Sequence, residues 1–214
     1  MIYLIGGAPR CGKTTLAKTI SKTLGIPWVA SDTLEAIAMG YTSDKDFSKR
    51  FPKTIIRKKT KYSNDLMYNN YTSNQIVSVY IKQSQAVWKA IEMLVESELK
   101  EGRSYIIEGY HVHPQLVINL QKKYGKKNFQ SIFLIKTNID NILRNSVKYA
   151  DRNDWFVKRT ADKDTYKKIA TMISEFGRYF NQQARKYNLK VFKMDVNFKT
   201  MLSKAKNCLV RGTT

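Results

Sequence analysis

The strongest constraint on the fold lies near the N-terminus, in a stretch that reads Gly7-Ala8-Pro9-Arg10-Cys11-Gly12-Lys13-Thr14-Thr15. It matches G-x-x-x-x-G-K-[ST] and lies between an apolar segment and a helical pattern, the context that a phosphate-binding loop requires. Glycines let successive backbone N–H groups point at a phosphate, and the positive end of the next helix adds to the attraction. We therefore expect this loop to hold ATP, with Lys13 at the β- and γ-phosphates and Thr14 at Mg²⁺.

Short apolar segments alternate with helical patterns along the chain, which is typical of a parallel sheet with helices on both faces. The strands are expected at Ile2–Ile5, Trp28–Ala30, Tyr105–Ile107, Ser131–Ile135 and Lys190–Lys193. The helices are expected at Lys13–Leu24, from a capping box at Thr72 and Gln75 to Gly102, from a second box at Thr137 and Asp140 through Leu143, and at Tyr166–Tyr187. The predicted fold is an α/β three-layer α/β/α sandwich with a five-stranded parallel sheet, of the P-loop NTPase type.

One face of the long helix after Thr72 carries Tyr80, Ser84, Val87, Ile91 and Leu94. We expect these side chains to pack in the core and to have no role in binding a ligand.

Size and charge restrict the class of protein further. The 214 residues fit a single domain, residues 1–214, with an inserted segment at about 41–71 and a lid at about 144–165. Lys and Arg number 38 against 17 Asp and Glu, so the surface should attract anions, nucleic acid among them, although a codon bias toward Lys is an equal explanation. No apolar run is long enough to span a membrane, and the cysteines form no metal pattern, so we expect a cytoplasmic protein.

A carboxylate after the second strand is the first candidate for work on an acceptor. The chain lacks the [NT]-K-x-D segment of GTPases, and small-molecule kinases instead place such a carboxylate opposite the γ-phosphate. Asp32 follows Trp28–Ala30 and would lie at the carboxyl edge of the sheet, where it could orient or deprotonate an acceptor hydroxyl. The competing interpretation is that Ser31 and Asp32 only begin a helix.

Arginines follow the fourth strand at spacings that suit a lid. Arg144, Arg152 and Arg159 lie in a polar stretch, where they could neutralise charge on a phosphoryl group in transfer. Arg152 is the preferred candidate because it lies in a loop-like segment, and a solvated basic face is the alternative.

The third strand ends in Glu108, where P-loop proteins keep a group that supports Mg²⁺. The stretch Glu108-Gly109-Tyr110-His111-Val112-His113-Pro114 resembles the Glu-Gly-Val-His-Leu-Val-Pro stretch of 2-phosphoglycerate kinase and related small P-loop kinases. The P-loop and Ser31-Asp32 are similar to the family's Gly-x-Ser-Gly-Ser-Gly-Lys-Ser and Thr-Asp segments. The resemblance implies a nucleoside-monophosphate-kinase-like fold, ATP with Mg²⁺, and transfer to a hydroxyl.

The resemblance is weaker in the segments that are expected to bind the acceptor. Where the family tends to continue Asp-x-Ile-Arg, this chain has Asp32-Thr33-Leu34-Glu35. His111 could contact the acceptor or act as a neutral hydrogen-bonding group behind Glu108. The inserted segment, which includes Arg57 and several tyrosines, should hold the acceptor unless it is an exposed basic loop. We expect the nucleotide base near Asp195 to Phe198.

Three functions remain open at this point. The first is an ATP-dependent kinase that phosphorylates a hydroxyl of a small, phosphorylated or otherwise anionic metabolite. The second keeps this chemistry with a polynucleotide 5′-hydroxyl or a nucleotide sugar as acceptor, the latter as in zeta-toxin-like kinases. The third is an ATP-dependent nucleic-acid-binding regulatory protein without phosphoryl transfer.

Overall fold

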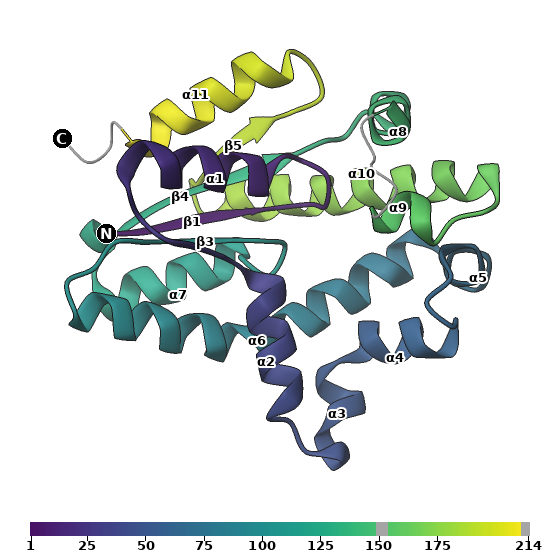
Figure 1. Ribbon diagram of the computed structural model, residues 1–214, viewed down its shortest axis with the longest axis horizontal. Coiled ribbons are helices and arrows are strands. Elements are labelled where there is room, and N and C mark those ends of the chain that lie inside the picture. The colour runs from purple at the N-terminus through teal and green to yellow at the C-terminus, as the bar shows by residue number, and fades with distance from the viewer. Residues whose placement is uncertain (149–153, 211–214) are drawn as a thin grey trace.

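The computed structural model describes residues 1–148 and 154–210 (Figure 1). Its centre is a parallel sheet in the order β2-β3-β1-β4-β5. The strands are β1 (Ile2–Gly7), β2 (Trp28–Ala30), β3 (Tyr105–Glu108), β4 (Phe129–Ile135) and β5 (Lys190–Lys193). All five expected strands are present, and the sequence misplaced their ends by at most two residues. The predicted α/β fold with a five-stranded parallel sheet is confirmed.

The strands in the middle of the sheet read as continuous apolar runs because helices cover both faces. Every residue of β1 is buried, whereas the edge strands β2 and β5 are only partly buried. In the register of β1 and β3, Ile5 lies opposite Glu108. The carboxyl ends of these two strands therefore open side by side at one edge of the sheet.

Helices form a layer on each face (Figure 1). α1 (Lys13–Leu24) and α11 (Phe198–Val210) lie on one face, and α6 (Ser73–Lys100), α7 (Pro114–Tyr124) and α10 (Lys163–Lys186) lie on the other. α1 has the bounds that the sequence predicts, and Gly25 ends it in a left-handed conformation. The capping box of α6 forms in full between Thr72 and Gln75.

The expected capping box at Thr137 and Asp140 is wrong by one residue. α8 (Ile139–Lys148) is instead capped by Asn138, whose side-chain oxygen accepts a hydrogen bond of 2.9 Å from the backbone N–H of Asn141. Asp195 explains the shift, because its carboxylate accepts hydrogen bonds from the backbone N–H groups of both Thr137 and Asn138.

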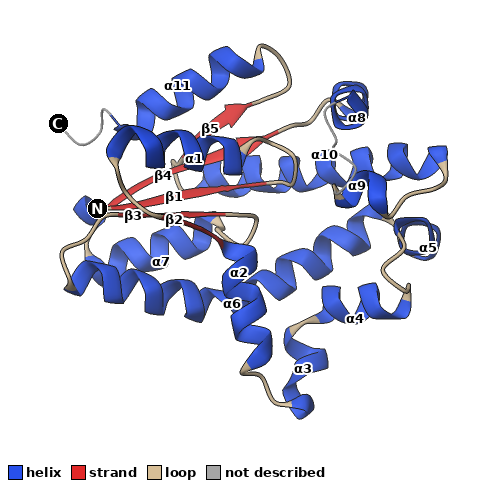
Figure 2. Cartoon of the chain, viewed as in Figure 1, coloured by secondary structure: helices blue, strands red, loops and turns tan. Residues whose placement is uncertain are grey.

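Short helices build most of the inserted segment, as Figure 2 shows. After α2 (Ser31–Gly40), the chain forms α3 (Asp44–Arg50), α4 (Pro52–Lys59) and α5 (Asn64–Asn70). α2 and α4 pack on α6, and α5 packs on α10. A single 3-10 turn, Lys126–Asn128, precedes β4, and α9 (Trp155–Lys158) follows α8. Within residues 1–148 and 154–210, no helix combines the length and the apolar character needed to cross a membrane.

Candidate active site

The phosphate-binding loop joins β1 to α1 and has the backbone conformation that its glycines allow. Gly7 has a φ of +131°, and a Cβ there would lie 2.0 Å from the carbonyl oxygen of Leu134. Lys13 is the first residue of α1, and its ammonium donates a 2.7 Å hydrogen bond to the carbonyl of Ala8, on the loop itself. The ammonium of Lys13 therefore lies at the loop, beside the N-terminal end of α1. Its charge and the positive end of the helix both attract a phosphate.

Thr14 and Glu108 meet beside this loop. The Thr14 hydroxyl donates a 2.8 Å hydrogen bond to Oε1 of Glu108, which is 3% exposed at the end of β3. Burial raises the pKa of Glu108, although Lys13 and the Thr14 hydroxyl both act to lower it. A hydroxyl and a buried carboxylate are oxygen ligands of the kind that Mg²⁺ binds, so these residues fit the predicted metal role.

A cavity of about 990 Å³ lies on one side of the loop. Its wall combines the start of α1 with the ends of β4 and β5 and the residues that follow them. The residues expected near the base, Asp195 to Phe198, all line it, and so does Arg144. The sequence analysis missed Lys136, a buried lysine whose pKa burial lowers and whose ammonium lies 5.9 Å from the centre of the Phe198 ring. Its position directly after the apolar strand β4 is the sequence feature that could have identified it.

A second cavity, of about 570 Å³, lies on the other side of the loop. Three loop residues, Arg10, Lys13 and Thr14, line both cavities. The remaining wall comes from α2, the inserted helices, α6, the end of β3 and α9: Pro9, Asp32, Met39, Lys53, Thr54, Arg57, Tyr62, Tyr80, Glu108, Tyr110, Trp155 and Arg159. Tyr80, which belongs to the face of α6 expected to be core, lines this cavity, whereas Ser84, Val87 and Ile91 of that face are buried as expected.

Asp32 lies in the first turn of α2 and lines the second cavity. Its side chain is exposed, and Glu108 and Lys13 share the same cavity wall. The two interpretations of Asp32 are therefore compatible, since the residue begins a helix and also faces the space beside the phosphate loop.

Two arginines of the second cavity have no carboxylate partner within residues 1–148 and 154–210. Arg57 is 8% exposed and donates to Oδ1 of Asn64 and to the carbonyl of Tyr62, both at 2.7 Å. The Arg159 guanidinium lies 5.6 Å from the centre of the Tyr62 ring. Burial lowers the pKa of Arg57, and the nearby positive charge of Arg159 lowers it further. The cavity wall thus includes two guanidinium groups whose observed contacts are with neutral groups.

Of the three arginines predicted for the lid, the two that the structure describes line different cavities. Arg144 lines the first cavity and Arg159 the second, while Arg152 lies outside the described residues. Arg10 provides the contact between the phosphate loop and α8, donating to the hydroxyl and the carbonyl of Ser146 at 3.0 and 3.1 Å.

Arg10 also connects the loop to α9. It forms an ion pair with Asp154, and its guanidinium lies 5.0 Å from the centre of the Phe156 ring. The end of α8 and the start of α9, both within the expected lid at about 144–165, therefore contact the phosphate loop through Arg10.

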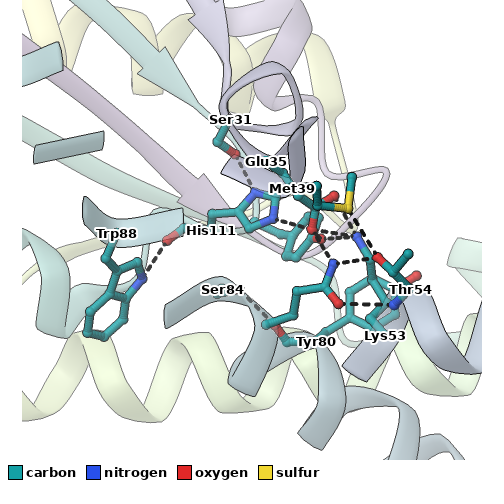
Figure 3. Close-up of polar contacts among 11 residues, drawn as sticks. Ser31, Glu35, Met39, Lys53, Thr54, Tyr80, Ser84, Trp88 and His111 are labelled. Carbon is teal, nitrogen blue, oxygen red and sulfur yellow. Dashed lines mark hydrogen bonds and ion pairs between the residues drawn. The ribbon is translucent and has the colours of Figure 1, made fainter. Parts of the chain in front are cut away.

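His111 is fully buried and is absent from the cavity wall. Its Nδ1 lies 2.8 Å from the Ser31 hydroxyl and its Nε2 lies 3.0 Å from Oε1 of Glu35 (Figure 3). Burial lowers the pKa of His111, so the neutral ring donates to Glu35 and accepts from Ser31. Two roles were left open for His111, contact with the acceptor and a neutral hydrogen-bonding group. These contacts fit the second role, although the partners of His111 are Ser31 and Glu35 and not Glu108.

Glu35 and Lys53 are the main residues that the sequence analysis missed. The Lys53 ammonium lies 2.8 Å from both carboxylate oxygens of Glu35 and also contacts the Tyr110 hydroxyl (Figure 3). Oε1 of Glu35 accepts further hydrogen bonds from Tyr110 at 2.9 Å and from Gln83 at 2.6 Å. Burial raises the pKa of Glu35, but the contacts with His111 and Lys53 outweigh it and hold this pKa well below its usual range.

Asp32, Glu35 and His111 also offer three ligand atoms within 4.8 Å of one another. The Lys53 ammonium already contacts both oxygens of Glu35, in the place that a metal ion would take. The group therefore forms an internal ion pair with its hydrogen bonds, whereas the Thr14 and Glu108 pair remains the better oxygen site for a cation.

Comparisons with known proteins agree with this architecture. No protein-family profile matches the chain. It is 28% identical over 192 residues to a protein of Methanocaldococcus jannaschii named 2-phosphoglycerate kinase, a match that covers 89% of the chain and 57% of the relative. A protein of the same name from Pyrococcus horikoshii is 25% identical over 214 residues, with 100% of the chain and 65% of the relative covered. The chain spans less than two thirds of the length of these curated relatives.

Two solved structures with similar folds are those of kinases. A gluconokinase from Sinorhizobium meliloti has a TM-score of 0.54 at 10% identity, with 98% of this chain and 91% of that one covered. A shikimate kinase from Bacteroides thetaiotaomicron has a TM-score of 0.50 at 13% identity, with 98% of each chain covered. The fold is therefore that of small P-loop kinases, and the resemblance to 2-phosphoglycerate kinase that short motifs indicated extends over most of the chain.

Proposed function

We propose that the protein is an ATP-dependent kinase that transfers the γ-phosphate to a hydroxyl of a small anionic metabolite. One observation carries the proposal: two cavities meet at Lys13 and Thr14, the residues that a P-loop uses to hold the reacting phosphates. ATP would bind in the larger cavity, with its base near Val196 and Phe198. The acceptor would bind in the smaller cavity, on the other side of the γ-phosphate.

The chemistry follows from the residues around that meeting point. Asp32 accepts the proton of the acceptor hydroxyl while the hydroxyl oxygen attacks the γ-phosphorus. The bond from the γ-phosphorus to the bridging oxygen breaks, and ADP leaves with that oxygen. Lys13 stabilises the charge that develops on the phosphate oxygens. Mg²⁺, held through Thr14 and Glu108, would neutralise charge on the β- and γ-phosphates.

The acceptor cavity supports a small, negatively charged substrate. Its volume of about 570 Å³ suits a small molecule. Arg57 and Arg159 lack carboxylate partners in the part of the chain that the structure describes. Arg57 is buried, and a buried unpaired cation is unfavourable until an anion binds to it, whereas Arg159 is an exposed cation on the same wall. These features favour a metabolite over a polynucleotide, which would need an open path along the surface.

Radiolabel transfer tests the proposal. The full chain is incubated with γ-labelled ATP, Mg²⁺ and, separately, 2-phosphoglycerate, gluconate, shikimate, nucleotide sugars and a 5′-hydroxyl oligonucleotide. We expect label on a small anionic acceptor, with transfer lost in Lys13→Ala and Asp32→Asn. Label on the oligonucleotide alone, or transfer that survives in Asp32→Asn, contradicts the proposal. ATP binding without any transfer, combined with salt-sensitive oligonucleotide binding, favours the regulatory alternative.

A further inference from the structure

The charged side chains on the wall of the acceptor cavity differ in what neutralises them. Arg10 is paired with Asp154, and Lys53 is paired with Glu35. Lys13 faces the phosphate loop, where its ammonium contacts the Ala8 carbonyl. Arg57 and Arg159 remain without a carboxylate within the described ranges, 1–148 and 154–210.

Lys53 reaches the cavity, but its ammonium is already fully engaged. Its donors contact both oxygens of Glu35 and the hydroxyl of Tyr110, and the ammonium lies 5.3 and 4.9 Å from the ring centres of Tyr80 and Tyr110. An ammonium has three N–H donors, so none is left for a substrate while Glu35 is ionised.

Glu35 is itself held in place from behind. His111, Tyr110 and Gln83 all donate to its Oε1, and Gln83 in turn accepts from the backbone N–H of Thr54 on α4. The carboxylate therefore cannot move away from Lys53 without breaking hydrogen bonds from helix α6 and from the segment after β3. The ion pair is a fixed part of the wall.

We propose that Glu35 limits acceptor specificity: by neutralising Lys53 it leaves Arg57 and Arg159 as the cations that receive an acceptor, so that a second anionic group on the acceptor adds no affinity. This inference rests on the proposed function and narrows its substrate class. A second anionic group would meet a neutralised Lys53 or the carboxylate of Asp32, and would gain nothing from either.

A matched pair of ligands tests the inference. Glycerol 2-phosphate and 2-phosphoglycerate share a skeleton, a hydroxyl and a phosphate, and differ in that a carboxylate replaces one CH₂OH. Their dissociation constants are measured by calorimetry on the full chain at fixed ionic strength. For the unmodified protein we expect the two constants to agree within about threefold, because the extra carboxylate finds no free cation.

Glu35→Gln is the decisive variant. It keeps the size of the side chain and releases the charge of Lys53, so we expect 2-phosphoglycerate to tighten by about tenfold or more relative to glycerol 2-phosphate. The preference should vanish in Glu35→Gln combined with Lys53→Met. Glu98→Gln is the matched control, since Glu98 is also buried and paired with an arginine, Arg103, but lines neither cavity. Thermal denaturation checks that every variant is folded.

Several outcomes overturn the inference: a preference above tenfold for 2-phosphoglycerate in the unmodified protein, an unchanged ratio in Glu35→Gln, a shift that persists without Lys53, or no binding of either ligand to any form. Failure of the proposed function looks different. If the ratio shifts as expected but no acceptor is labelled from ATP, the specificity role of Glu35 stands and the kinase activity does not.

Discussion

The hydroxyl of Thr14 donates a 2.8 Å hydrogen bond to the carboxylate of Glu108, joining the first turn of α1 to the end of β3. The sheet dictates this contact, because Ile5 at the end of β1 lies opposite Glu108 in the register. The phosphate loop leaves the sheet two residues beyond Ile5, so its Thr14 meets the strand end beside it. The order of the strands thus brings Thr14 and Glu108 together, although they lie far apart in the sequence.

Removing the charge of Glu108 should weaken the dependence of nucleotide binding on Mg²⁺. In Glu108→Gln we expect the gain in ATP affinity that Mg²⁺ provides to fall by about tenfold, while affinity in EDTA changes little, because Lys13 and the loop remain. A fluorescent ATP analogue, titrated with and without Mg²⁺, measures both constants. Glu98→Gln should behave as the unmodified protein, and an equal Mg²⁺ effect in all three forms contradicts the metal role.

Gly109 should be far less tolerant of a side chain than a glycine at a free turn. A Cβ at Gly109 would lie 1.8 Å from Oγ and 2.9 Å from Cβ of Ser31, at a φ of +147°. Rotation of Ser31 away from it would break the hydrogen bond with His111. We expect Gly109→Ala to lower the free energy of unfolding by about 2 kcal/mol more than Gly102→Ala, which meets open space at a φ of +66°. Urea denaturation measures both, and equal losses contradict the close contact.

Cys11 should be unreactive although it lies within the phosphate loop. It is fully buried, and burial raises its pKa to about 11, so the thiolate that reacts with alkylating agents is scarce near neutral pH. We expect iodoacetamide to modify Cys208, which is only partly buried, before Cys11. Mass spectrometry of the labelled peptides gives the order, and modification of Cys11 at the same rate as Cys208 would show that the loop opens.

Local signals in the sequence were enough to predict the sheet and the position of the phosphate-binding loop. The P-loop pattern, the apolar strands and the box at Thr72 each depend on neighbours within a few residues, and the structure has all of them. The positions of Glu108 and Asp32 beside the phosphate loop could be predicted because the carboxyl ends of parallel strands gather at one edge of the sheet. The capping residue of α8 was missed because the carboxylate of Asp195, which is distant in the sequence, accepts hydrogen bonds from the backbone N–H groups of Thr137 and Asn138.

The second cavity, where we propose that the acceptor binds, depends on packing between segments that share no sequence pattern. Glu35 and Lys53 lie on α2 and α4, and their pairing requires both helices to pack against α6. The sequence showed only an unexpected acid at position 35. Arg144 and Arg159 were grouped by their spacing in the sequence, but they line different cavities.

His113 should make the protein less stable in mild acid. It is 1% exposed and packs against the rings of Trp88, Tyr179 and Phe180, with Nδ1 lying 3.2 Å from the Tyr179 hydroxyl. Burial lowers its pKa from 6.5 to about 3. The folded protein therefore binds a proton less readily than the unfolded chain, so the contribution of neutral His113 is complete above pH 6.5 and declines as the pH falls.

Between about pH 7 and pH 5 this one group should remove about 2 kcal/mol of the free energy of unfolding. The window isolates it from Glu35, whose depressed pKa stabilises the folded state until the pH falls below the ordinary carboxyl range. The pKa of His111 is also lowered by burial, so it adds a loss of the same sign. Urea denaturation at both pH values measures the total. In His113→Phe, where an aromatic ring still fills the site, the loss should shrink by about 2 kcal/mol, and an unchanged loss would mean that His113 is not neutral and buried in the folded protein.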